Sequence, residues 1–302
     1  MAQPMVSVVM CTYNGSKFID EQIKSILSQD YSHLELIISD DLSTDDTWQK
    51  VNKWMENDNR IKLYQNEINL GYNKNFENAL RLATGEFIAI SDQDDIWMPE
   101  KISELVRSFK DETVILSHNR SVRLENGRLR FKSASLHHHY KGNDTRRLFM
   151  FNQINGHDMM FRKQLLEKAL PIPEGIMYDW WLAVVATSFG RIASVNKYLV
   201  HHRIHSENSF FSKEQGSNKS QVDVQHVLQS FTTINSLDEK SRSFLNELLL
   251  LVKKHKEKTN GFDLSFFLFL IKNGKIIFGH KRRWIPQLQY LKSSLKYASS
   301  NK

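Results

Sequence analysis

The beginning of the chain alternates short apolar runs with segments in which apolar residues recur every three or four positions. The apolar runs are typical of buried strands and lie at 6–11, 34–39, 61–64 and 86–91. The segments with helical spacing lie at 18–29, 47–55 and 75–83. Because strands and helices alternate, the pattern predicts an α/β domain with a largely parallel central sheet.

Beyond this alternation the pattern becomes less regular. The later elements that we expect are a strand hairpin, a helix and a strand, at 114–131, 180–188 and 193–202. After about residue 215 the sequence turns helical and basic, with helical spacing at 222–234 and 241–256 and a mixture of aromatic and basic residues over 265–297. The sequence therefore predicts an α/β domain over 1–215 and a helical, basic region over 216–302.

Polar residues follow three of the predicted strands. They are Thr12, Tyr13 and Asn14 after the first, Asp40 and Asp41 after the second, and Asp92, Asp94 and Asp95 after the fourth. In open α/β sheets ligands bind beyond the carboxyl ends of the strands. The sequence therefore predicts a binding site at that edge.

The carboxylates at 92–95 repel one another, and a divalent metal would compensate their charge. Hard oxygen ligands suit magnesium or manganese, whereas the alternative is a solvated acidic turn. Asp41 could accept hydrogen bonds from a pyrimidine or a ribose hydroxyl, or the turn could only cap the helix at Thr47 through Thr44 or Asp45.

A further carboxylate, Asp179, opens a predicted helix among aromatic residues. Such a carboxylate can have a raised pKa and act as a general base. Trp180 and Trp181 could offer a flat platform to a sugar. The alternative is a capping aspartate with two tryptophans of the core.

Two histidines, His201 and His205, lie four positions apart near the end of the predicted late strand. On a helix this spacing can bind zinc, but no glutamate follows in the His-Glu-x-x-His pattern, and 195–200 favours a strand. We expect His205 to complete an oxygen-rich metal site. A zinc hydrolase built on both histidines is the alternative.

Amino-acid composition and charge limit the classes of binding partner. The net charge of +7 is compatible with nucleic acid, an anionic membrane surface or polyphosphate substrates. Neither zinc-finger spacing nor an RNA-binding signature is present, which disfavours nucleic acid. Cys11 is the one cysteine, the amino-terminal residues lack a signal-peptide pattern, and the longest apolar run, 266–271, is far short of the about 20 residues that span a bilayer. These features predict a cytoplasmic protein.

Several segments, taken together and in this order, resemble glycosyltransferase family 2, whose catalytic domain has the GT-A fold. The matching segments are 6–14, 38–45, 69–71, 83–85, 92–97, 178–183 and 202–208. The resemblance covers about residues 5 to 210 and implies an inverting sugar transfer that needs one catalytic base and Mn²⁺ or Mg²⁺.

Carried over residue by residue, the resemblance implies a role for each matching position. Asp179 would be the catalytic base, and Asp94 and His205 would bind the metal. Trp180 and Trp181 would contact the acceptor. The donor-binding residues would be Thr12, Tyr13, Asn14, Asp41, Asn69, Lys74, Asp92 and Gln93.

The chain departs from the family pattern at two positions: Leu42 stands where glycine is usual, and His202 where tyrosine is usual. The Gln-x-x-Arg-Trp element of processive synthases is missing, so we expect one sugar per turnover. The motif spelling at 91–97 and 179–183 further resembles bacterial rhamnosyltransferases and hexosyltransferases of surface polysaccharide assembly. That implies a dTDP- or UDP-sugar donor and a polyprenyl-diphosphate-linked saccharide acceptor.

The carboxyl-terminal region mixes aromatic and aliphatic residues over 262–278 with the basic run that follows at 279–284. Such a mixture can lie at an anionic bilayer surface, which predicts peripheral association with the inner face of the cell membrane. The alternative is a helical appendage that packs on the catalytic domain or on a second subunit. A non-catalytic carbohydrate-binding or scaffolding protein with the same fold is the remaining alternative for the whole chain.

Overall fold

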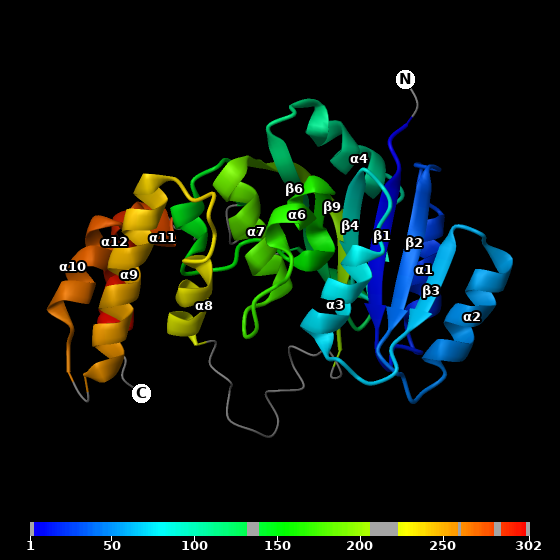
Figure 1. The fold of residues 1–302 in the computed structure, drawn as a ribbon, viewed down its shortest axis with the longest axis horizontal. Coiled ribbons are helices and arrows are strands. Elements are labelled where there is room, and N and C mark those ends of the chain that lie inside the picture. The colour runs from blue at the N-terminus through cyan, green and yellow to red at the C-terminus, as the bar shows by residue number, and fades with distance from the viewer. Residues whose placement is uncertain (1–2, 132–138, 206–222, 259–260, 281–284, 300–302) are drawn as a thin grey trace.

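The computed structural model describes residues 3–131, 139–205, 223–258, 261–280 and 285–299. A single mixed sheet forms its centre, with strand order β3-β2-β1-β4-β8-β6-β9-β5 and β7 paired to β6 (Figure 1). The strands are β1 (Val6–Thr12), β2 (Leu34–Asp40), β3 (Ile61–Gln65), β4 (Phe87–Ser91), β5 (Ile96–Trp97), β6 (Val114–Glu125), β7 (Arg128–Arg130), β8 (Met159–Arg162) and β9 (Arg191–Ile204).

Helices cover both faces of this sheet. Those of the α/β part are α1 (Ile19–Leu27), α2 (Thr47–Asn57), α3 (Tyr72–Arg81), α4 (Lys101–Arg107), α6 (Gln164–Ala169) and α7 (Tyr178–Phe189), with the 3-10 turns η1 (Ser108–Lys110), η2 (Thr145–Leu148) and η3 (Gly156–Asp158). Alternate residues of β1 enter two separate cores: Val8 packs with the α1 side and Val9 with the α3 side. A strand buried on both faces explains the continuous apolar run at 6–11.

The first half of the sheet confirms the predicted parallel order. β1 pairs in parallel with β2 and β4, with Val6 opposite both Leu34 and Phe87. β3 continues the parallel order beside β2. Because these strands start level, their carboxyl ends meet at one edge, where Thr12, Asp40 and Ser91 lie.

The second half corrects the expectation of a largely parallel sheet. β8 runs antiparallel to both β4 and β6, and β5 runs antiparallel to β9. β6 pairs in parallel with β9 and, as predicted, forms a hairpin with β7. Two antiparallel steps return β6, and with it β9, to the direction of β4. The carboxyl end of β9 and the amino end of β8 therefore reach the same edge as the carboxyl end of β4.

The helical carboxyl-terminal region consists of α8 (Val224–Phe231), α9 (Glu239–Glu257), α10 (Leu264–Lys272), α11 (Gly274–Phe278) and α12 (Pro286–Ser299). Its core is continuous with that of the sheet layer: the rings of Trp181 and Phe231 stack with centroids 6.2 Å apart. Figure 1 shows α9 to α12 at the end of the molecule away from β3 and α2. The predicted boundary at 215/216 lies outside the described residues. Among those described, no helix is long and apolar enough to cross a membrane.

Candidate active site

The turn after β2 is held by its own carboxylates. Asp40 is buried and accepts a hydrogen bond from Thr12 Oγ1 at 2.8 Å and from the backbone N–H of Ser43 at 2.9 Å. Asp41, also buried, accepts from the backbone N–H groups of Leu70 and Gly71, each at 2.8 Å. These bonds tie the end of β2 to two neighbouring segments of the site.

The loop before α3 is fixed by the same carboxylate. Asn66 Nδ2 donates to Asp41 Oδ1 at 2.8 Å, and Asn69 Nδ2 donates to the Asp41 carbonyl at 3.0 Å. Gly71 has φ +77°, a conformation that favours glycine. Asn69, expected at the donor, therefore shapes the loop that surrounds Asp41.

Leu42 adopts φ +63°, in the left-handed region. This is the position at which the sequence departs from the family glycine, and its φ gives the physical reason for that glycine.

The segment after β1 is held against the acidic turn after β4. The amide of Gln93 accepts from Tyr13 N–H at 2.9 Å and donates to the Tyr13 carbonyl at 3.0 Å. Asn14, at φ +48°, accepts from Thr44 N–H at 2.8 Å through its side chain. The ring of Tyr13 remains about half exposed, so it is accessible to a planar ligand. Backbone bonds thus fix Tyr13, Asn14 and Gln93 at one edge.

Asp94 and His205 come together as predicted. His205 Nε2 and Asp94 Oδ2 form a hydrogen bond of 2.8 Å, and Arg203 Nε donates to the Asp94 carbonyl at 2.9 Å. Burial raises the pKa of Asp94, and the hydrogen bond from His205 opposes that rise. The pair offers a carboxylate and an imidazole, both of which are ligands of divalent metals.

A second cluster lies beside this pair and was not predicted as a unit. The ligand atoms of Asp92, Asp95, His157 and His202 all lie within 4.8 Å of one another. The rings of His157 and His202 stack at 4.4 Å, and His202 Nδ1 lies 3.1 Å from Asp95 Oδ1. Asp95 Oδ2 is buried and has no hydrogen-bond partner among the described residues. His157 Nδ1 lies 3.9 Å from that oxygen, beyond hydrogen-bond distance. A divalent cation could provide the closer contact, so the residues of this edge fit a metal.

His157 supplies positive charge to the acidic cluster. Burial lowers its pKa, but Asp158, Asp95 and Asp92 outweigh burial and raise the pKa to about 10. Lys101 is fully buried beneath it, and its Nζ donates to the His157 carbonyl at 2.6 Å. Burial lowers the pKa of Lys101 to about 7, against the opposing effect of the same three carboxylates.

Sequence reasoning missed His157 and Lys101. The signal for His157 was the polar run Asn155–Asp158 before an apolar strand. No signal marked Lys101, because nothing in the neighbouring sequence distinguishes it from an ordinary surface lysine.

Asp179 lies near the start of α7, and its side chain is buried. Burial raises the pKa of Asp179 to about 6, and the negative charge of Asp92 adds to this rise. The N–H of Trp180, which donates to Asp179 Oδ1 at 2.7 Å, opposes the rise in pKa. The two carboxylates are therefore close enough for the charge of Asp92 to act on Asp179. Tyr178, which precedes Asp179, contacts Tyr72 with hydroxyl oxygens 3.3 Å apart. A carboxylate with this pKa is ionised at neutral pH and still basic enough to take a proton.

The two tryptophans after Asp179 lie in the core, not at the site surface. Trp180 Nε1 donates to the Leu148 carbonyl and Trp181 Nε1 to the Ala169 carbonyl, at 2.6 and 2.7 Å. Both are buried, so neither presents an open ring face to an acceptor. Their burial agrees with the alternative reading of core tryptophans.

Two other expected residues lie apart from the cluster. Lys74, more than half exposed, pairs with Glu77 at 3.1 Å rather than with a site residue. His201 lies on β9 opposite Ile96, and four positions along a strand separate it from His205 by about 13 Å. The two histidines therefore do not form the zinc pair that a hydrolase would need.

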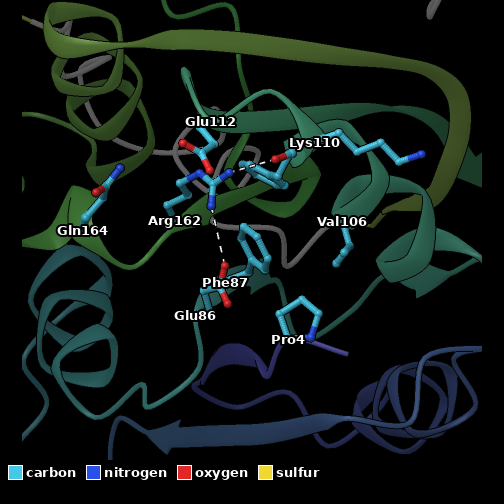
Figure 2. A pocket seen from close by; sticks show the side chains of 9 residues that line it. Pro4, Glu86, Phe87, Val106, Lys110, Glu112, Arg162 and Gln164 are labelled. Carbon is cyan, nitrogen blue, oxygen red and sulfur yellow. Dashed lines mark hydrogen bonds and ion pairs between the residues drawn. The ribbon is translucent and has the colours of Figure 1, made fainter. Parts of the chain in front are cut away.

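A pocket opens at the opposite edge of the sheet, where β1 and β4 begin (Figure 2). Arg162 reaches into it, but its guanidinium already donates to the carbonyls of Val114 and Phe109, at 3.0 and 2.8 Å. Arg162 also forms an ion pair with Glu86 at 3.6 Å, so its charge is already compensated. The candidate catalytic residues lie at the carboxyl edge instead.

Known proteins share this architecture. The chain is similar to an uncharacterized glycosyltransferase of Haemophilus influenzae, at 28% identity over 280 residues that cover 85% of this chain and 82% of the relative. Escherichia coli WfaP, a UDP-Glc:alpha-D-GlcNAc-diphosphoundecaprenol beta-1,3-glucosyltransferase, is 38% identical over 115 residues, which cover 38% of this chain and 45% of WfaP. Residues 1–349 of S. aureus TarS, solved with UDP-GlcNAc, have the same fold, with TM-score 0.64, 21% identity and coverage of 90% of this chain and 81% of that chain.

The chain shares the GT-A fold, with carboxylates gathered at the carboxyl edge of its sheet, and its sequence relatives are named as glycosyltransferases. Residues 7–170 match the sequence profile of Glycosyl transferase family 2. The chain therefore belongs to glycosyl transferase family 2. Asp179 and His205 lie beyond the matched residues, so their roles depend on the geometry described above.

Proposed function

We propose that the protein is an inverting, metal-dependent glycosyltransferase that moves one sugar, rhamnose or a hexose, from a dTDP- or UDP-sugar to a polyprenyl-diphosphate-linked saccharide. The product would serve bacterial O-antigen, capsule or cell-wall polysaccharide synthesis. The observation that carries this proposal is the placement of Asp179, with a pKa of about 6, within the electrostatic reach of the acidic cluster around Asp92. A transferase needs a base and a diphosphate-binding centre at this proximity.

The donor would lie across the ends of β1, β2 and β4. Tyr13 is accessible for stacking on the base, and Asp41 lies buried at the same edge of the sheet. Backbone hydrogen bonds hold both residues in place before a ligand arrives. A preformed donor site loses less conformational entropy on binding.

Asp94 and His205 would hold Mn²⁺ or Mg²⁺, with Asp92 beside them. A bound cation would offset the negative charge that develops on the leaving diphosphate. Arg203 supports this arrangement, since it donates to the Asp94 carbonyl while its N–H donates to Asp95. The chain thereby fixes the turn from which Asp94 projects.

Asp179 would take the proton from the acceptor hydroxyl as that oxygen forms the new glycosidic bond. Because the reaction is a single displacement, one base is sufficient, unlike the paired carboxylates of a glycoside hydrolase. The N–H of Trp180 donates to Asp179 Oδ1 at 2.7 Å, and Asn152 and the N–H of Gly156 also donate to this carboxylate. These bonds orient Asp179 at the site.

The name of the similar E. coli protein specifies a diphosphoundecaprenol acceptor, and this supports a lipid-linked acceptor here. An acceptor of that kind is anchored in a bilayer. We therefore place the enzyme at the inner face of the cell membrane.

The test is release of nucleoside diphosphate from a panel of donors: dTDP-rhamnose, UDP-glucose, UDP-galactose and UDP-N-acetylhexosamines. Each is supplied with manganese, magnesium or a chelator, with and without a polyprenyl-diphosphate sugar. The variants are Asp94→Ala and, as a matched control, Glu112→Gln, an exposed carboxylate at the opposite edge.

Metal-dependent release from one donor, lost in Asp94→Ala and kept in Glu112→Gln, would support the proposal and identify the donor. Absence of release from every donor, together with no donor binding by calorimetry, would refute it in favour of a carbohydrate-binding scaffold.

A further inference from the structure

Helix α10 is apolar on two opposite faces. Phe266, Phe269 and Leu270 are buried against the rest of the protein. Leu264, Leu268 and Ile271 follow the spacing i, i+4, i+7 and are exposed, Leu268 to 56%. A helix that is apolar all round is normally covered on all sides.

Helix α12 repeats this arrangement next to α10. Leu288, Leu291 and Leu295 follow the spacing i, i+3, i+7 and are exposed, Leu288 to 59%. The opposite face of α12 is buried through Ser293 and Ser294. The two helices contact each other, and both lie in the outer group of helices in Figure 1. We call the six exposed residues of the two stripes the C-terminal apolar face.

Exposed basic residues lie close to these apolar residues along the sequence. Lys272, Lys275, Lys292 and Lys296 are all exposed, and Lys292 and Lys296 directly follow Leu291 and Leu295. Residues 261–302 contain eight Lys or Arg and a single acidic residue, Asp263. The net charge of this segment equals the +7 of the entire chain, so residues 1–260 are neutral overall.

We propose that the C-terminal apolar face binds the surface of an anionic lipid bilayer, with its leucines at the boundary of the acyl chains and its lysines at the headgroups. Apolar area and positive charge are the two terms that stabilise interfacial helices. This inference rests on the proposed function for the membrane-anchored acceptor, and it specifies the surface that brings the enzyme to that acceptor.

Charge favours a bilayer over a second copy of the chain. A symmetric dimer through this face would bring together two segments that each carry +7, and like charges across an interface oppose association. Anionic lipid headgroups supply the complementary charge instead. A bilayer also covers two adjacent helices without requiring a matching groove.

The experiment is co-sedimentation of the full-length protein with vesicles of phosphatidylcholine alone or of phosphatidylcholine mixed with phosphatidylglycerol, neither containing acceptor. The test variant is Leu268→Gln with Leu291→Gln; glutamine keeps helix propensity and removes apolar area. A second variant, Lys292→Gln with Lys296→Gln, tests the charge. Met55→Gln is the control, because Met55 is exposed on α2 at the other end of the molecule.

The expected result is binding to the anionic vesicles that weakens at least about tenfold in the leucine variant. The lysine variant should bind less and show a weaker salt dependence, and Met55→Gln should bind as the wild type does. Circular dichroism spectra and thermal unfolding midpoints like those of the wild type would show that all variants are folded.

Three outcomes would overturn the proposal: no binding to anionic vesicles at low salt, equal binding by all variants, or light scattering that shows a dimer split by the leucine substitutions without any vesicle binding. Because the vesicles contain no acceptor, this test can fail while nucleotide-sugar turnover succeeds, and the reverse.

Discussion

The two halves of the site differ in how their carboxylates are satisfied. In the donor half, Asp40 and Asp41 accept hydrogen bonds from backbone N–H groups of neighbouring loops, so they are structural before any ligand binds. In the catalytic half, the oxygen Asp95 Oδ2 has no hydrogen-bond partner among the described residues and only a 3.9 Å ion pair with His157, and burial raises the pKa values of Asp94 and Asp179. Removing carboxylates of the first half should damage stability, whereas removing those of the second should damage chemistry.

The largest effect should come from Asp179→Asn. Loss of the general base should lower kcat by about 10²- to 10⁴-fold. Donor binding should persist, because Asp179 lies outside the loops that hold Tyr13 and Asp41. Calorimetric titration with the donor, beside steady-state transfer rates, separates the two quantities. A loss of donor affinity as large as the loss of rate would contradict this division of the site.

The pH profile should follow the same carboxylate. Asp179 must be ionised to accept a proton, so kcat should fall as the pH drops through its pKa of about 6. The initial transfer rate with saturating donor and acceptor, measured from acid to neutral pH, checks this. A profile that is flat through this range would assign the proton transfer to another group.

In the donor half, Asp41→Ala should destabilise the fold by about 2–3 kcal/mol, because the backbone N–H groups of Leu70 and Gly71 and the amide of Asn66 lose their shared acceptor. Urea unfolding measures the change. Asp94→Ala is the comparison: it removes a buried charge next to Asp92 and Asp95, so the expected loss is smaller. Equal destabilisation by the two substitutions would contradict the distinction between a structural donor half and a chemical catalytic half.

Asp179 should also affect stability with a sign that depends on pH. Its pKa is about 6 in the folded state and about 3.9 in the unfolded chain, so the folded state holds more protons between these values. Stability should therefore fall as the pH rises through that window, and above it the ionised group costs about 1–3 kcal/mol. Asp179→Asn should be more stable than the wild type at pH 8 and equal to it at pH 4. Thermal unfolding at both values tests this, and stabilisation that is equal at the two would exclude Asp179 as the cause.

The parallel half of the fold could be predicted from sequence because its signals are local. Each apolar run in 6–91 ends in polar residues, and Asp41, Asp92 and Asp94 reach the edge through the ordinary order of βαβ units. Asp94 and His205 could be paired through the family resemblance.

The other half depends on strand pairings that sequence periodicity does not contain. His157 reaches the site because β8 runs antiparallel between β4 and β6. Lys101 lies buried near Asp92, Asp95 and Asp158, which oppose the fall of its pKa on burial, and the fold alone brings these residues together. The two tryptophans were ambiguous for the same reason: their spacing alone cannot distinguish a core from an open platform, and the carbonyls that accept their N–H groups lie 12 and 32 positions away.

The smallest expected effect concerns Leu42, in the turn that follows β2. Leu42 holds φ +63°, a conformation that costs a residue with a side chain about 1–2 kcal/mol, and glycine avoids this cost but loses more entropy on folding. Leu42→Gly should therefore stabilise the protein by about 0.5–1 kcal/mol, while Leu42→Ala, which keeps a Cβ, should not. The free energies of unfolding of the two variants, measured in urea, test both expectations. Stabilisation by alanine as well would mean that the exposed leucine side chain, not its backbone, is the source of the strain.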